Sequence, residues 1–400
     1  MNAFAKQRLA RLHAVMAGFV ERGELPGVVT VLARGDEVHV DAIGALGLGG
    51  REPMRRDTIF RITSMTKPIT AAAALILVEE CRLRLDDPVD PWLPELANRR
   101  VLRRPDGPLD DTVPAARPIS LRDLLTFRLG LGMIVHSEPW PIQVAERELG
   151  IPGFGPPDVA SPHDPDEWMR RLGTLPLMHQ PGAAWQYGLG SYVLGVLIAR
   201  ASGRPHEAFL RERIFEPLGM RDTSFAVPAA KLPRLASSYW VDAATGGLTL
   251  HDDPKASAWA RPPAFPDGGA GLVSTADDYL AFARMLLESG RHGSERILSR
   301  AAVETMTTDQ LTPEQRRGPD AFGDFFASRG FGFGVAVQLR RDDLWTTPGR
   351  YGWDGGYGTS WANDPREGLV AIQLTQRAGF PGTSAPYVDF WTSVYQALDD

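Results

Sequence analysis

The arrangement of apolar and polar positions along the chain predicts β-strands near both of its ends. Residues 27–40 form two runs rich in valine, with a turn at Arg34-Gly35-Asp36, and this pattern is typical of a β-hairpin. Toward the other end, runs rich in β-branched and aromatic residues predict strands at 331–339, 358–362 and 369–375.

Helical patterns fill the middle of the chain and flank these strands. Ser120 and Asp123 form a capping-box pattern, which predicts a short helix that continues to about residue 127. An apolar run follows residue 68 with almost no polar break, as expected for a helix buried on all sides. The predicted helices are 1–20, 69–81, 192–201, 205–215, 277–287 and 387–398.

This order of elements predicts an α+β (α/β) fold. Its simplest form is a mostly antiparallel central sheet built from both chain ends, flanked by helices, with an inserted and mostly helical domain. We expect residues 1–85 plus 264–400 to form the sheet domain and residues 86–263 the inserted domain, with an active site at their interface.

The amino-acid composition limits the kinds of molecule that this protein is expected to bind. Hydrophobic residues make up 43% of the 400 positions and charged residues 23%, which is typical of a globular protein. The net charge of −6 gives no reason to expect nucleic acid or an anionic membrane as a partner. The amphipathic start does not resemble a signal peptide, and no stretch is apolar enough to cross a bilayer, so we expect a cytoplasmic protein. The single cysteine, Cys81, falls on an apolar helix and is expected to be packed in the core.

The residues with the clearest chemistry are Ser64 and Lys67, in the pattern Ser-x-x-Lys. The chain has only four lysines, so the pairing is uncommon by chance. Positions i and i+3 lie on one face of a helix, which brings the amine beside the hydroxyl. A serine nucleophile needs such a base, and arginine would not serve because it stays protonated. The alternative interpretation is a surface Ser and Lys near a helix start.

The flanking residues favour the chemical interpretation. Residues 58–62 read as a strand that leads into Ser64, and Pro68 is tolerated only in the first turn of a helix. Ser64 is therefore expected at the N-terminus of a buried helix, where free backbone N–H groups stabilise an oxyanion. A plain core helix that begins with a serine is the alternative.

Further segments, in order along the chain, support a family resemblance. They are Pro181-Gly182-Ala183-Ala184-Trp185-Gln186-Tyr187-Gly188-Leu189, Gly268-Gly269-Ala270-Gly271-Leu272-Val273-Ser274-Thr275 and Gly352-Trp353-Asp354-Gly355-Gly356. Together with Ser64-x-x-Lys67, they resemble the serine β-lactamase and penicillin-binding protein superfamily over nearly the whole chain. The resemblance is closest to the class C-like branch known as family VIII carboxylesterases, and it implies a β-lactamase/transpeptidase-like fold.

The resemblance also implies roles for individual residues. Ser64 would be the acylated nucleophile, with Lys67 as base or proton relay and Tyr187 as the group that passes a proton to the leaving group. The backbone amides of Ser64 and Gly356 would form the oxyanion hole, which is typically a large contribution to acyl transfer. Either Lys67 or Tyr187 could take the first proton.

The chain departs from the lactamase pattern where β-lactams are recognised. Leu189 stands in place of an asparagine, and Trp353-Asp354-Gly355 replaces a Lys-Thr-Gly or His-Thr-Gly element. Tryptophan cannot supply the cation that holds the β-lactam carboxylate. We therefore expect Leu189, Trp353, Asp354 and Gly355 to line a substrate site suited to neutral esters. The segment 124–131 also differs from relatives and is expected to reshape the nearby cleft wall.

These observations predict a serine hydrolase that cleaves small-molecule carboxylic esters through an acyl-enzyme on Ser64, with no cofactor. An acyltransferase of the same fold, a β-lactamase or D-amino-acid peptidase, and a relative that only binds its ligand are the alternatives. The eight histidines are scattered without metal-ligand spacing, so no metal site is expected. No Gly-x-Ser-x-Gly or phosphate-binding glycine motif is present.

Overall fold

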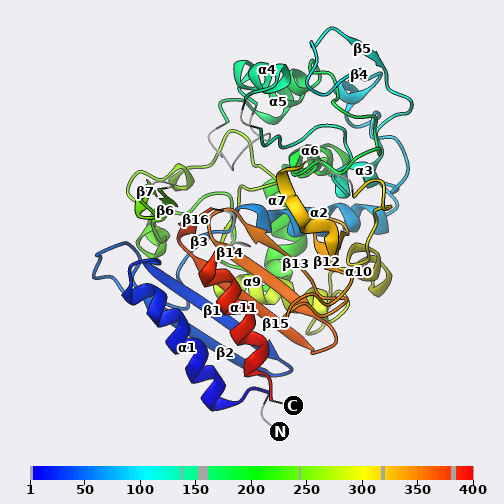
Figure 1. Ribbon diagram of the computed structural model, residues 1–400. Helices are drawn as coiled ribbons and strands as arrows, with labels where there is room; N and C mark the ends of the chain where they lie inside the picture. The colour runs from blue at the N-terminus through cyan, green and yellow to red at the C-terminus, as the bar shows by residue number, and fades with distance from the viewer. Residues whose placement is uncertain are drawn as a thin grey trace.

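A seven-stranded antiparallel sheet forms the centre of the computed structural model (Figure 1). The structure describes residues 3–136, 138–151, 161–242, 245–316, 320–379 and 384–399. The strand order is β11-β12-β13-β14-β15-β1-β2, so the N-terminal hairpin pairs with the last long strand of the chain. The strands are β1 (Gly27–Arg34), β2 (Glu37–Gly44), β11 (Arg329–Phe331), β12 (Ala336–Gln338), β13 (Tyr351–Gly355), β14 (Thr359–Asp364) and β15 (Leu369–Thr375).

Alternation along the central strands divides the core between the two faces of the sheet. Val29 and Val31 of β1 face one way, into the large core that also contains helices α2 (Thr66–Glu79) and α9 (Ala276–Leu287). Val28 and Leu32 face the other way, toward α1 (Lys6–Glu21) and α11 (Ala385–Ala397). Both faces are covered, which explains why β1 and β15 are mostly apolar and buried along nearly their whole length.

The two ends of the described chain lie together on one side of the sheet. Helices α1 and α11 run side by side across it (Figure 1). The Ala5 N–H donates a hydrogen bond to the Ala397 carbonyl at 2.9 Å, and Phe4 is bridged to Leu398. The sheet thus requires residues from both ends of the chain, as the sequence pattern predicts.

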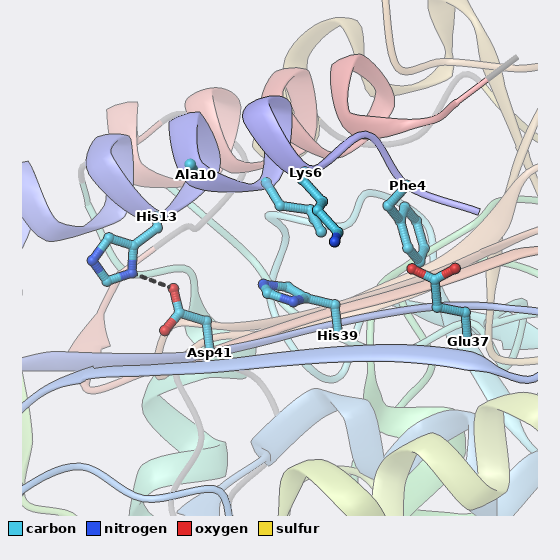
Figure 2. A pocket seen from close by; sticks show the side chains of 8 residues that line it. Phe4, Lys6, Ala10, His13, Glu37, His39 and Asp41 are labelled. Carbon is cyan, nitrogen blue, oxygen red and sulfur yellow. Dashed lines mark hydrogen bonds and ion pairs between the residues drawn. The ribbon is translucent and has the colours of Figure 1, made fainter. Parts of the chain in front are cut away.

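A groove of about 540 Å³ lies between α1 and the edge strand β2 (Figure 2). Across it, His13 Nδ1 and Asp41 Oδ2 are 2.6 Å apart. Lys6, Glu37 and His39 also line the groove. Because α1 and α2 cover opposite faces of the sheet, this groove is separated from the helix that carries Ser64.

The segment between β2 and β11 supplies most of the remaining helices and several short strands. The capping box at α3 forms as expected: the Ser120 hydroxyl accepts from the Asp123 N–H, and the Asp123 carboxylate accepts from the Ser120 N–H. These helices are α3 (Leu121–Leu125), α4 (Pro141–Leu149), α5 (Pro165–Leu172), α6 (Leu189–Ser202), α7 (His206–Leu210), α8 (Glu216–Leu218) and α10 (Arg300–Met306). The short strands are β3 (Phe60–Arg61), β4 (Arg100–Leu102), β5 (Thr112–Pro114), β6 (Ser238–Val241), β7 (Leu248–Asp252), β8 (Val273–Ser274), β9 (Arg291–His292) and β10 (Glu295–Arg296), and β16 (Arg377–Ala378) pairs with β6.

Two expectations differ from the structure. The single strand predicted at 331–339 is two short antiparallel strands, β11 and β12, because Gly334 adopts a φ of +71° and reverses the chain. Cys81 is exposed rather than packed in the core, because α2 ends at Glu79 and Cys81 turns the chain with a φ of +58°. The proposed domain borders at 85/86 and 263/264 stay a prediction.

In the described part of the chain, no helix combines the length and apolarity needed to cross a membrane. Among the same residues, His, Cys, Asp and Glu side chains form no group of three suited to a metal ion.

Candidate active site

Ser64 lies at the junction between a short strand and a helix that is buried along most of its length. Strand β3 leads into a single 3₁₀ turn, Thr63–Met65, and α2 begins directly after it. Ser64 is only 5% exposed. Within this turn the Met65 N–H donates to the Ile62 carbonyl at 3.0 Å, and the Thr66 N–H donates to the carbonyls of Thr63 and Ser64, so hydrogen bonds hold the backbone around the serine. The predicted placement of Ser64 at the start of a buried helix is therefore what the structure has.

The residue before Ser64 has an unusual backbone conformation. Thr63 has a φ of +41°, a region that β-branched residues rarely adopt. Such a backbone conformation costs on the order of 1–3 kcal/mol of folding free energy and persists only where the surrounding structure holds it in place. Here the Ile62 carbonyl is held by the Thr359 hydroxyl at 3.2 Å, and the Met65 carbonyl by the Tyr279 hydroxyl at 3.0 Å. The strained turn fixes the direction of the Ser64 side chain.

Lys67 reaches Ser64 from the next turn of the helix. Its Nζ lies 3.1 Å from Ser64 Oγ and donates a hydrogen bond to the Gly269 carbonyl at 2.7 Å. The same nitrogen lies 4.7 Å from the centre of the Tyr187 ring. The lysine is 2% exposed, so water is largely excluded around it. This geometry is suited to proton transfer between the serine and the lysine.

Tyr187 joins the site from the loop that precedes α6. Gly188 follows it with a φ of +100°, which turns the chain into the helix. The Tyr187 hydroxyl oxygen accepts a hydrogen bond from Trp353 Nε1 at 3.0 Å. An indole N–H directed at this oxygen stabilises negative charge that develops there.

The end of β13 packs against the turn that carries Ser64. Gly355 lies so close to this turn that a Cβ atom on it would meet the Ile62 carbonyl oxygen and the Thr63 hydroxyl at less than 3.0 Å. Gly356 follows directly, and its carbonyl accepts from the Gly379 N–H at 2.9 Å. Gly356 therefore lies at the strand end nearest the nucleophile. Its role as the second oxyanion-hole amide stays a prediction.

The structure separates the residues that were expected to line the substrate site. Trp353 contacts Tyr187 and is part of the site. Asp354 points to the opposite face of the sheet, where its carboxylate accepts from the Ser360 hydroxyl at 2.5 Å and from the Tyr387 hydroxyl at 3.2 Å. Burial there raises the pKa of Asp354 above its usual range. Leu189 is fully buried in the main core. The structure thus brings Trp353 to Tyr187 and Gly355 to the Ser64 turn, but it directs the side chains of Asp354 and Leu189 elsewhere.

An aromatic cluster supports the site from behind. Phe127 packs edge-on against Tyr187 with ring centres 5.6 Å apart, and it also contacts Trp185 and Phe331. Phe127 lies in the segment expected to reshape the cleft wall, and its φ of +55° directs the chain around the cluster. Such packing restricts the positions open to the Tyr187 ring.

Two features of the site escaped sequence reasoning. The Gly269 carbonyl that holds Lys67 is a backbone atom, so no residue pattern reveals it. Asp267 is a buried carboxyl two residues earlier, in a segment where only the glycines and small residues supported the family resemblance. The available sequence signal for Asp267 was an aspartate directly before a Gly-Gly-Ala-Gly run.

A substitution at Gly355 tests how tightly β13 packs against the Ser64 turn. We expect Gly355→Ala to lower the free energy of unfolding by about 3 kcal/mol, because the new methyl group overlaps backbone atoms that have little room to move. Gly18→Ala is the control: a methyl group on the helix α1 meets only the end of the Arg22 side chain at 3.0 Å, so stability should rise by about 0.5–1 kcal/mol. Urea unfolding of both variants measures the difference, and a Gly355→Ala protein as stable as wild type would contradict the packing described.

Comparison with known proteins identifies the family of this chain. The profile of the beta-lactamase family matches residues 12–390. The chain is 40% identical to Protein Rv1367c of Mycobacterium tuberculosis, over 89% of this chain and 87% of that protein. It is 34% identical to Esterase EstB of Burkholderia gladioli, over 94% of this chain and 92% of the esterase. Among solved structures, EstCE1, described as a hydrolase with promiscuous acyltransferase activity, superposes with a TM-score of 0.78 at 29% identity and covers 97% of this chain and 99% of its own. The chain belongs to the beta-lactamase family, and its fold matches that of solved structures similar to it.

Proposed function

We propose that this protein is a carboxylesterase that hydrolyses small neutral esters through an acyl-enzyme on Ser64. The observation that carries the proposal is the 3.1 Å separation between Lys67 Nζ and Ser64 Oγ at the start of a buried helix. The similarity to Esterase EstB supports ester cleavage as the reaction.

The first half of the reaction transfers the acyl group to the serine. Ser64 Oγ attacks the ester carbonyl carbon, and its proton passes to Lys67 or Tyr187. The negative charge on the carbonyl oxygen is stabilised by the amides of Ser64 and Gly356. The bond to the alcohol oxygen then breaks, and the leaving alkoxide takes a proton from the Lys67–Tyr187 pair. The products of this half are the free alcohol and an ester of Ser64.

The second half removes the acyl group. Water attacks the Ser64 ester and gives its proton to the same pair, and the serine recovers a proton as the carboxylic acid leaves. Trp353 supports both halves, because its indole N–H holds the hydroxyl of Tyr187, whose ring lies against Lys67 Nζ. No step requires a group other than these side chains and the two amides.

Trp353 also favours esters over β-lactams. It occupies the position at which lactamases carry a cation for the substrate carboxylate, and its indole N–H is already bonded to Tyr187. A substrate carboxylate would therefore meet an aromatic ring rather than a positive charge at this point. β-Lactamase or D-peptidase activity is expected to be weak for that reason.

An acyltransferase of the same fold is the second candidate. EstCE1 is described as a hydrolase with promiscuous acyltransferase activity, which favours considering an alcohol as the second nucleophile. The acyl-enzyme would be the same, and only the group that attacks it would differ.

Turnover of p-nitrophenyl butyrate by the wild-type protein tests the proposal. We expect release of p-nitrophenol, and mass spectrometry of protein quenched during turnover should find a butyryl group on the peptide that contains Ser64. Hydrolysis without this adduct, or an adduct on another peptide, would contradict the mechanism. Adding an alcohol separates the two candidates: a new butyrate ester as the main product indicates acyl transfer, and butyric acid indicates hydrolysis.

A further inference from the structure

A buried carboxyl group lies directly behind the lysine of the active site. Asp267 is 2% exposed and belongs to the loop between β7 and β8. One of its oxygens accepts a hydrogen bond from the Gly269 N–H at 2.5 Å. The carbonyl of the same glycine accepts from Lys67 Nζ at 2.7 Å. Asp267 therefore contacts the residue whose carbonyl positions Lys67.

The loop that carries Asp267 is tied to the surrounding helices at several points. Thr70, one turn after Lys67 on α2, donates to the Gly268 carbonyl at 2.7 Å. On α7, a ring nitrogen of His206 lies 3.1 Å from the Pro266 carbonyl. A Cβ on Gly269 would overlap the Tyr192 ring of α6, so the glycine fits closely between that ring and Asp267. The position of the Gly269 carbonyl is thus fixed from three sides.

The charge of Asp267 needs an explanation beyond this hydrogen bond. A neutral side chain such as asparagine would accept from the Gly269 N–H as well, and burying a carboxylate is costly unless a positive charge compensates it. Burial raises the pKa of Asp267 to about 6, and the Lys67 ammonium acts in the opposite direction. The positive charge of Lys67 therefore stabilises the carboxylate form of Asp267.

The other titratable groups around Asp267 are few. Tyr192 on α6 acts on the carboxyl through a hydrogen bond, and His206 on α7 lies beside the same loop. Burial lowers the pKa of His206 to about 4, so its ring is neutral near pH 7. Tyr187 lies on the far side of Lys67. Among these neighbours, Lys67 is the partner that carries a compensating charge.

We propose that Asp267 is a positioning residue that acts through Lys67. Its carboxylate fixes the Gly269 carbonyl that holds Lys67 Nζ beside Ser64, and its negative charge sets the pH range in which Lys67 takes the serine proton. The inference rests on the proposed function only in assigning Ser64 and Lys67 to proton transfer.

Labelling of Ser64 with a fluorophosphonate tests this role, because it reports on the serine without requiring ester turnover. In Asp267→Asn the hydrogen bond to Gly269 is retained and the charge is lost. The ammonium form of Lys67 is then less favoured, so the acidic limb of the pH–rate profile should move to lower pH by about one unit. The melting temperature should not fall. A folded Asp267→Asn protein with the wild-type limb would overturn the proposal.

Asp278→Asn is the matched control. Asp278 is also a buried carboxyl that accepts from a backbone N–H, that of Asp222, at 2.7 Å, and from the Thr223 hydroxyl at 2.9 Å. It has no contact with Lys67 among its described interactions, so its substitution should leave the labelling profile unchanged. An equal shift in Asp278→Asn would assign the effect to lost buried charge in general and overturn the specific role of Asp267.

Two further measurements keep the outcome decisive. If Asp267→Asn does not fold, Asp267→Ser retains an acceptor in a smaller side chain, and the same shift is expected. If neither variant folds, the pH dependence of Ser64 labelling in the wild-type protein gives the answer. A labelling rate that depends on two ionising groups supports coupling between Asp267 and Lys67, and a rate that depends on one ionising group overturns the proposal. A wild-type protein that is labelled but does not hydrolyse esters would refute the proposed function alone.

Discussion

Ser64→Ala is expected to lower kcat/KM for p-nitrophenyl butyrate by about 10⁴-fold or more, to a rate set by the remaining oxyanion-hole and binding interactions. The methyl group cannot form the covalent ester on which the mechanism depends. The side chain of Ser64 is buried and its hydrogen bond in the described structure is the one to Lys67, so the substitution should leave the fold intact. Steady-state kinetics and far-UV circular dichroism of the two proteins measure both expectations.

A second serine provides the control for Ser64→Ala. Ser393 is also buried, at 7% exposure, but it lies on α11 at the opposite face of the sheet. Ser393→Ala should retain wild-type kcat/KM. If Ser64→Ala is as active as wild type, another residue is the nucleophile and the proposed mechanism is wrong.

Lys67→Ala should lower kcat by about 10³- to 10⁴-fold, with a smaller change in KM. The lysine contacts the nucleophile and not the distant groups of the substrate. Its loss should therefore raise the energy of the transition state more than it weakens substrate binding. Lys67→Arg should not restore the rate, because a guanidinium stays protonated and cannot accept the serine proton. Kinetics with p-nitrophenyl butyrate across pH 6–9 gives the measurement.

The double variant Ser64→Ala/Lys67→Ala shows whether the two residues act as one unit. Groups that share a single step are not additive, so the double variant should be no slower than Ser64→Ala alone. Lys231→Ala is the matched lysine control: its amine is paired with Asp222 at 2.7 Å, away from the site, and its loss should not change kcat. Full activity of Lys67→Ala would exclude the lysine as base or relay.

Sequence reasoning predicted the parts of this protein in which local pattern and tertiary environment agree. The strand at 369–375 has the predicted bounds, because both faces of β15 are buried and most of its positions are apolar. Ser64 and Lys67 meet as expected, since the 3₁₀ turn that contains Ser64 continues directly into α2 and keeps the two residues close. Local spacing was enough for this prediction, so no knowledge of the tertiary fold was needed.

The remaining parts depend on contacts between distant segments. Successive side chains of a strand point to opposite faces of the sheet, so Asp354 points away from the face on which Trp353 meets Tyr187. Both residues were assigned to one motif from the sequence, and that assignment did not take this alternation into account. The break between β11 and β12 depends on one left-handed glycine within an otherwise strand-like run. The support of Lys67 by the Gly269 carbonyl joins residues 202 positions apart.

The pairing of β1 with β15 has a consequence for how this chain is made on the ribosome. Val28 lies opposite Thr375, so one long edge of the N-terminal hairpin cannot find its partner until almost the whole chain has been synthesised. At about 5–20 residues per second, that interval is on the order of tens of seconds. During it, the nascent polypeptide presents an unpaired apolar strand, a template for association with other chains. We therefore expect yield in recombinant expression to depend on chaperone supply and temperature more than the stability of the finished protein would indicate.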